Sequence, residues 1–94
     1  MTDFINQLFT LILDRRDHPR EGSYTNHLFE AGLDEMLKKI GEESVEVILA
    51  AKGQGDERLV SELADLTYHC LVLLAASGLS PMDIQHELER RFKP

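Results

Sequence analysis

Four carboxylates stand at spacings that could bring their oxygens together. Glu43 and Glu46 are three residues apart in one apolar stretch, and Glu62 and Asp65 repeat that spacing in the next. Residues three apart share one face of a helix, because each residue turns the chain by about 100°. Carboxylate oxygens are ligands that Mg²⁺ and Mn²⁺ prefer, and Mg²⁺ bound to a protein commonly bridges substrate phosphates. The four residues therefore predict a Mg²⁺ site, with Mn²⁺ as the alternative ion.

The segments that must position these residues are helical. Glycine and proline divide the chain, and the stretches between them place apolar residues at helical spacing. Ser23 and Ser80 are candidate N-caps, and Pro81 suits the first position of a helix. No segment alternates like a strand. We expect helices at residues 3–17, 24–31, 34–52, 56–77 and from 81 onward.

These helices predict an all-α fold, a single domain over residues 1–94. With so short a chain the core is thin, so we expect an antiparallel helical bundle that is completed by dimerisation. The link Gly53-Gln54-Gly55 is so short that the helices on either side should form an antiparallel hairpin. Their expected facing stripes are Leu33, Leu37, Ile40, Ser44, Val47 and Ala51 on one helix, and Leu59, Leu63, Leu66, Cys70 and Leu74 on the other.

The hairpin should set the four acids level across its two helices. Glu46 and Glu62 are equally far from the link, and so are Glu43 and Asp65. Helix axes in contact lie about 8–10 Å apart. Two carboxylates about 6 Å apart repel by roughly 3 kcal/mol at an effective dielectric near 20, so four together need a positive charge between them.

A solvated acidic face is the competing interpretation. Lys38 and Glu42, and likewise Lys39 and Glu43, are four residues apart and could form ordinary helix ion pairs. For any one glutamate this interpretation is strong, and for the four acids together the metal site explains more. Glu42 points further around its helix and is expected to order Lys38 or an attacking water.

The chemistry that fits this set is hydrolysis of a nucleotide's phosphoanhydride bond. It requires neutralised phosphates, a positioned water and a base. Candidate catalytic residues are Glu42, Glu43 and Glu46, and candidate metal ligands are Glu43, Glu46, Glu62 and Asp65. Candidates for binding the substrate are Arg15, Arg16, Ser23, Tyr24, Thr25, Lys38, Lys39 and His69, with Arg58 as a further cation.

Several of these substrate-binding candidates have a simpler structural explanation. Arg15 and Arg16 could face the dipole of their own helix C-terminus. The segment from Ser23 could offer helix N–H groups to a phosphate, or could simply cap the helix. His69 follows Asp65 by one turn, and a lone histidine is more often structural than functional.

Composition narrows the classes of partner and compartment. The chain has 17 acidic and 10 basic residues, for a net charge of -7, which argues against binding nucleic acid. Cys70 is the single cysteine, so no internal disulfide can form, which fits a reducing compartment such as the cytoplasm. We find no secretion signal, and the apolar run from Cys70 is too short to span a membrane. We therefore expect a cytoplasmic protein with neither nucleic acid nor membrane as partner.

The acidic pattern resembles the EExxE…ExxD signature of the all-α nucleotide pyrophosphohydrolases. Beyond it, the chain is similar to the phosphoribosyl-ATP pyrophosphohydrolase family of histidine biosynthesis, from its first helix to Arg91. The similar segments are Gly22-Ser23-Tyr24-Thr25, Lys39 through Val47, and Glu62-Leu63-Ala64-Asp65-Leu66-Thr67-Tyr68-His69. Ser44 stands where many members carry alanine.

The resemblance implies a function beyond what the residues alone indicate. It implies Mg²⁺-dependent hydrolysis of phosphoribosyl-ATP to phosphoribosyl-AMP and pyrophosphate, by a homodimer acting on a small-molecule nucleotide. Two alternatives stay open. One is a house-cleaning nucleoside triphosphate pyrophosphatase of the same superfamily. The other is a non-catalytic helical dimer whose acidic patch binds a basic partner.

Overall fold

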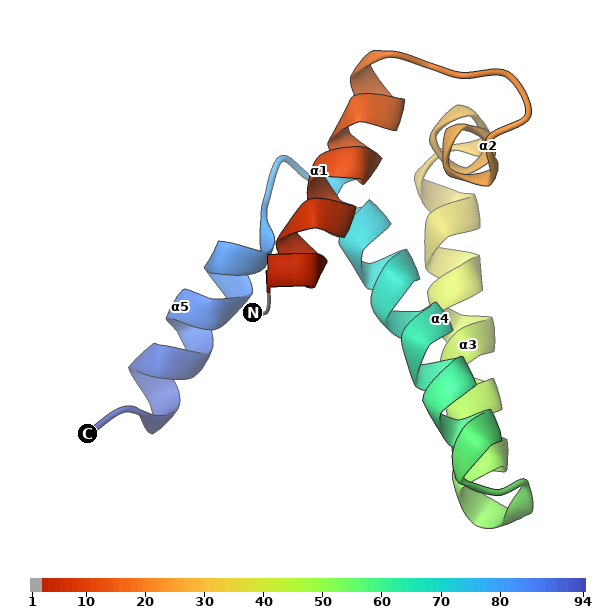
Figure 1. Ribbon diagram of the computed structural model, residues 1–94, viewed down its shortest axis with the longest axis vertical. Helices are drawn as coiled ribbons and strands as arrows, with labels where there is room; N and C mark the ends of the chain where they lie inside the picture. The colour runs from red at the N-terminus through yellow and green to blue at the C-terminus, as the bar shows by residue number, and fades with distance from the viewer. Residues whose placement is uncertain (1–2) are drawn as a thin grey trace.

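Five α-helices make up the part of the chain that the computed structural model describes, residues 3–94 (Figure 1). No strand occurs in this range, so the all-α prediction is confirmed. The first two expected helices have the bounds observed, the third is one residue longer at each end than expected, and the fourth ends one residue earlier. The helices are α1 (Asp3–Asp17), α2 (Tyr24–Ala31), α3 (Leu33–Gly53), α4 (Asp56–Ala76) and α5 (Pro81–Phe92).

The two long helices, α3 and α4, form the expected antiparallel hairpin and share the most extensive contact in the fold (Figure 1). The backbone N–H of Gln54 donates to the carbonyl of Ala50 and ends α3. Gly55 follows with φ of 89°, in the region that favours glycine, and the chain then reverses into α4. The sharp turn fixes which residues of the two helices stand level.

The hydrophobic core lies at the open end of the hairpin, where α1 and α2 cover it. Side chains from all four helices meet there and exclude water, and this contact holds α2 against the upper half of the hairpin. The buried apolar cluster consists of Phe9, Ile12, Leu28, Met36, Leu71, Val72 and Ala75.

Asn26 fixes the loop between α1 and α2. Its side chain is buried, and its Nδ2 donates to the carbonyl of Arg15 at 2.5 Å. Its Oδ1 accepts from the backbone N–H of Arg20 at 2.7 Å. A buried amide with both ends paired is a specific connection. This one therefore sets where α2 begins relative to the end of α1.

The apolar stripes expected at the hairpin interface are partly wrong. Leu33, Leu37 and Leu63 were expected to face inward and are 55%, 46% and 43% exposed. The buried positions are instead Met36 and Ala50 on α3, and Glu62, His69, Leu71, Val72 and Ala75 on α4. Each helix has apolar residues on two adjacent faces, so spacing could not tell which one meets the partner helix. The packing turns the acidic residues towards the interface between the helices.

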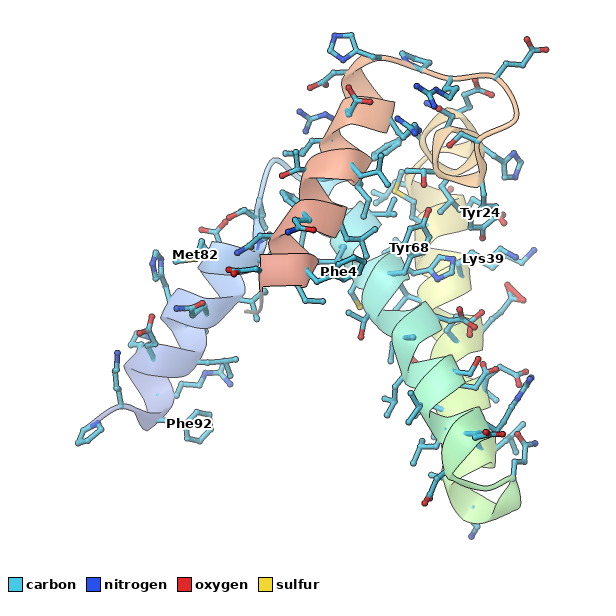
Figure 2. The ribbon with its side chains drawn as sticks, in the orientation of Figure 1. Phe4, Tyr24, Lys39, Tyr68, Met82 and Phe92 are labelled. Carbon is cyan, nitrogen blue, oxygen red and sulfur yellow. The ribbon has the colours of Figure 1, made fainter. Side chains whose placement is uncertain are left out.

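The α5 helix stands away from the hairpin and contacts α1 (Figure 1). Its apolar residues are exposed, including Met82 and Phe92, which are labelled in Figure 2, and Leu88. On the hairpin, Ile48 and Val60 are 60% and 66% exposed. Two apolar surfaces, on α5 and on the hairpin, are therefore open to solvent in the single chain.

Within residues 3–94, α4 is the one helix long and apolar enough to cross a membrane, with a mean hydropathy of 1.4 over its most apolar stretch. A core helix of the same length passes the same test. The α4 helix contacts α1, α2 and α3. Of this stretch 28% is buried within the single chain, and α4 leaves apolar residues such as Val60 and Leu63 exposed.

Candidate functional site

Three of the four predicted metal ligands come together on the hairpin. Glu43 of α3 and Glu62 and Asp65 of α4 each offer a carboxylate oxygen, and these oxygens lie within 4.8 Å of one another. Glu62 is 4% exposed, Glu43 is half-buried and Asp65 is exposed, so the cluster runs from the helix interface out to solvent. The carboxylates meet because of the register of the hairpin, which sets Glu43 and Asp65 level across the two helices, as expected from the sequence.

The electrostatics of this acidic cluster are unfavourable without a counter-charge. Burial raises the pKa of the Glu43 carboxyl, and a hydrogen bond with Glu62 and the charges of Asp65 and Glu62 raise this pKa further. Glu43 Oε2 is buried and has no hydrogen-bond partner. Such an oxygen is costly to bury unless something positive meets it. The all-oxygen donor set therefore fits a hard divalent cation such as Mg²⁺ or Mn²⁺.

Arg58 supplies part of the missing positive charge. Its Nη2 lies 3.1 Å from Glu62 Oε1, one turn along α4. The guanidinium is half-exposed while the carboxylate is buried, so the pair reaches from solvent to the base of the cluster. Arg58 was predicted as a further cation for the substrate phosphates. In the structure it already has an acidic partner.

Glu46 and Glu42 lie outside this close group. Glu46 is half-buried on α3, one turn beyond Glu43, and the grouping of oxygens within residues 3–94 does not include it. Glu42 is exposed, in agreement with its expected position further around the helix. The expected lysine pairs are absent from the described ion pairs, in which neither Lys38 nor Lys39 takes part.

Two crossed hydrogen bonds join the start of α2 to the middle of α4. Tyr24 Oη and His69 Nε2 are 3.1 Å apart, and the hydroxyl groups of Thr25 and Tyr68 are in hydrogen-bond contact. The rings of Tyr24 and Tyr68 stack with centroids 6.2 Å apart, and both meet His69 edge-on. Two neighbours on one helix thus hold two neighbours on the other. We call these four residues the α2–α4 latch.

The latch borders the acidic cluster. His69 Nδ1 lies 2.7 Å from the backbone carbonyl oxygen of Asp65. Burial raises the pKa of the Tyr24 hydroxyl, and the negative charges of Glu35, Glu43 and Asp65 raise it further. Figure 2 shows Tyr24 and Tyr68 at the upper part of the hairpin, with Lys39 extending from α3 on the same side as Tyr24. Tyr68 was not among the predicted site residues, although its place beside His69 was the signal for it.

The predicted arginines of α1 are engaged at the end of their own helix. Arg15 Nη1 pairs with Asp14 at 2.8 Å, and Arg16 pairs with Asp17 at 2.8 Å. Arg16 Nη1 also donates to the carbonyl of Ala75, where α4 ends, at 2.9 Å. The structure therefore gives both arginines a structural contact.

A cavity of about 590 Å³ opens beside the loop that precedes α2. Ser23, Tyr24 and Arg20 line it together with His27 and Glu30 of α2. Ser23 caps α2 by accepting from the backbone N–H of Asn26 at 3.3 Å, so its capping role is confirmed. Tyr24 belongs both to this cavity and to the latch.

Comparison with known proteins identifies close relatives. The sequence profile of the family described as phosphoribosyl-ATP pyrophosphohydrolase matches residues 5–92. The "Phosphoribosyl-ATP pyrophosphatase" of Clostridium botulinum strain Hall is 55% identical over 93% of this chain and 79% of its own length. The protein of that name in Listeria welshimeri is 58% identical, over 93% and 84%. The "Histidine biosynthesis bifunctional protein HisIE" of Caldanaerobacter subterraneus is 47% identical, over 97% of this chain and 44% of its own length.

Proposed function

This chain belongs to the phosphoribosyl-ATP pyrophosphohydrolase family, and on that premise we propose that it hydrolyses phosphoribosyl-ATP to phosphoribosyl-AMP and pyrophosphate in histidine biosynthesis. The main structural support for this proposal is the acidic cluster of Glu43, Glu62 and Asp65, in which Glu43 Oε2 is buried without a hydrogen-bond partner. A polyanionic substrate approaches three carboxylates only if cations stand between them. We therefore assign the triphosphate end of the substrate to this face of the hairpin.

In this proposal Mg²⁺ is held by Glu43, Glu62 and Asp65, with Glu46 as the fourth ligand from α3. The metal, when bound, neutralises phosphate charge and polarises the phosphorus–oxygen bonds. Support for the assignment comes from the negative charges of Glu62 and Asp65 beside the Glu43 carboxyl, because a cation held among three carboxylates relieves their repulsion.

The protein's own groups then have defined tasks. A water attacks the α-phosphorus, its proton passes to a carboxylate, and the bond from that phosphorus to the oxygen of the departing pyrophosphate breaks. Glu42, Glu43 and Glu46 are the proposed group for positioning this water and accepting the proton. Glu42 is exposed and has no place in the close group, which leaves it available for this task.

Cations and hydroxyls around the cluster complete the proposed substrate site. Lys38 and Lys39 enter no ion pair among the described residues, which leaves both ammonium groups able to meet phosphates. The remaining proposed contacts are Arg15, Arg16, Ser23, Tyr24 and Thr25, and His69, which is buried, belongs to the proposed site through its contact with Tyr24. Of these, Arg15 and Arg16 would have to exchange present partners for a phosphate, and the arginines are therefore the weaker members.

We further propose that the chain, a single domain over residues 1–94, works as a homodimer in the cytoplasm, without nucleic acid or membrane as partner. Among residues 3–94 the buried apolar cluster has seven residues, which is small for a free-standing chain. Ile48, Val60 and Phe92 are among the large apolar residues that a second copy would cover. Molecular mass by light scattering at several concentrations, for the native chain and Ile48→Glu, tests this assembly.

Pyrophosphate release from phosphoribosyl-ATP, with and without Mg²⁺, tests the reaction. We expect metal-dependent release, and loss of turnover with retained helicity in Glu62→Gln. A panel of ordinary and modified nucleoside triphosphates tests the house-cleaning alternative, which predicts faster turnover of one of those than of phosphoribosyl-ATP. Absence of metal-dependent release from every substrate would favour the non-catalytic dimer.

A further inference from the structure

The protonation of the latch follows from its geometry. The backbone carbonyl of Asp65 can only accept a hydrogen bond, so His69 Nδ1, 2.7 Å away, carries the ring proton. In the neutral imidazole Nε2 is then an acceptor. While the ring is neutral, Tyr24 Oη, 3.1 Å from Nε2, therefore donates its proton to the ring. The order of donation runs from Tyr24 to His69 to the backbone of α4.

This order decides what Tyr24 can offer a ligand. Its single proton is committed to His69, so its oxygen presents only lone pairs. A phosphate oxygen is an acceptor and finds no donor there. A group that brings its own O–H proton can donate to Tyr24. The negative charges that surround Tyr24 also repel a phosphate, and they therefore favour a neutral O–H donor.

His69 is placed to act through Tyr24 and not on a substrate directly. Its side chain is buried, 6% of the residue is exposed, and each ring nitrogen has a partner. Tyr24 in contrast is 47% exposed and lines the cavity beside α2. The buried ring can therefore set the direction of the tyrosine hydroxyl while it stays out of contact with a bound nucleotide.

We propose that His69 is a positioning residue that presents the oxygen of Tyr24 as a hydrogen-bond acceptor to an O–H donor in the substrate complex, either a ribose hydroxyl of the nucleotide or a water. The proposal rests on the proposed function for the identity of the nucleotide. It revises the sequence-based prediction, in which Tyr24 and His69 were both residues that bind the substrate. It also separates Tyr24 from Thr25, whose hydroxyl is paired with Tyr68.

Four single variants and one double variant test the proposal. Tyr24→Phe removes the acceptor and keeps the ring stack, and Tyr68→Phe is the matched control, because it removes the other hydrogen bond of the latch. His69→Leu removes the ring acceptor, and His69→Gln can keep an acceptor near the position of Nε2. Thermal unfolding of each variant separates losses of stability from losses of function.

We expect Tyr24→Phe to lower kcat/KM for phosphoribosyl-ATP about tenfold, the size of one lost hydrogen bond that is not replaced, and Tyr68→Phe to lower it less. His69→Leu should match Tyr24→Phe, the double variant should lose no more than either, and His69→Gln should recover part of the loss. Equal losses in Tyr24→Phe and Tyr68→Phe would overturn the proposal, since docking of α2 alone would then explain both. Additive losses in the double variant, or abolished turnover in His69→Leu with a normal Tyr24→Phe, would also overturn it.

Substrate analogues that each lack one hydroxyl of the two ribose rings distinguish the two donors. If a ribose hydroxyl donates, the native protein turns over the analogue without that hydroxyl less efficiently, and Tyr24→Phe adds no further loss on it. If water donates, Tyr24→Phe lowers kcat equally on every analogue. Calorimetric binding of phosphoribosyl-AMP to the same variants keeps the inference testable without turnover. If the native protein is inactive but binds phosphoribosyl-AMP, and Tyr24→Phe binds it more weakly, only the proposed function is contradicted. If Tyr24→Phe leaves this binding unchanged, the inference is contradicted as well.

Discussion

Replacing Glu43 with glutamine should stabilise the protein when no divalent cation is bound. Glu43 shares the cluster with Glu62 and Asp65, and burial together with these neighbours raises the pKa of its carboxyl. Glutamine has nearly the same shape and no charge, and its amide can donate to the neighbouring carboxylate. Glu43→Gln therefore removes a repulsion while it retains the packing of the hairpin.

The size of the effect follows from the geometry of the cluster. Carboxylate oxygens within 4.8 Å of each other repel by about 3 kcal/mol per pair at an effective dielectric near 20. Protonation of Glu43 sets an upper limit to this repulsion, because protonating a carboxyl with the ordinary pKa of 4.5 costs about 4 kcal/mol at pH 7.5. The ion pair of Arg58 with Glu62 offsets a further part. We expect a gain of about 1–2 kcal/mol, or roughly 5–10 °C in Tm.

The gain should depend on pH in a defined direction. Because the pKa of Glu43 is raised on folding, its carboxyl favours the folded state only while protonated. That contribution is complete below the unfolded pKa of about 4.5 and is lost as the pH rises through the raised value. Glu43→Gln should therefore match the native protein at pH 4 and exceed it increasingly towards pH 7.5.

Thermal unfolding followed by circular dichroism, at one fixed protein concentration in chelator, measures this difference. Added Mg²⁺ should then stabilise the native protein, by about 2.7 kcal/mol at a hundred times its Kd, and should stabilise the variant less. The control is Glu30→Gln, an exposed glutamate of α2, with an expected change within about 0.5 kcal/mol. A variant less stable than the native protein in chelator at pH 7.5 would refute the repulsion argument, and an equal response to Mg²⁺ would refute the role of Glu43 as a ligand.

Three further predictions concern contacts around the cluster and the exposed surface. Arg58→Met leaves the buried Glu62 without its cation, so urea unfolding in chelator should show a loss of about 1 kcal/mol, most of which Mg²⁺ restores. Asn26→Leu leaves a backbone carbonyl and an N–H of the α1–α2 loop unpaired and should cost about 2–3 kcal/mol by the same assay, with KM for the nucleotide raised as well. Ile48→Glu should lower the light-scattering mass to that of one chain, and an unchanged mass would show that this surface lies outside the interface.

The helices and the family were readable from the sequence. Glycine and proline punctuation gave the bounds of α1 and α2 as observed, because caps and turns are set by local backbone chemistry. The short link at Gly53 to Gly55 required a hairpin, and counting from it placed Glu43 level with Asp65. These predictions needed no knowledge of packing, since chain length and helix geometry alone determine them.

The tertiary structure decided which helix faces meet and what each polar group touches. The stripes containing Leu37 on α3 and Leu63 on α4 looked suited to the interface, but in the folded chain both residues are exposed while Glu62 and His69 are buried. The pairing of Tyr24 with His69 joins residues 45 positions apart, and no local pattern encodes it. Sequence thus determined the residue types and their register along each helix. The rotation of the helices, set by burial of side chains distant in sequence, determined that three carboxylates share one site and that a histidine is committed to a tyrosine.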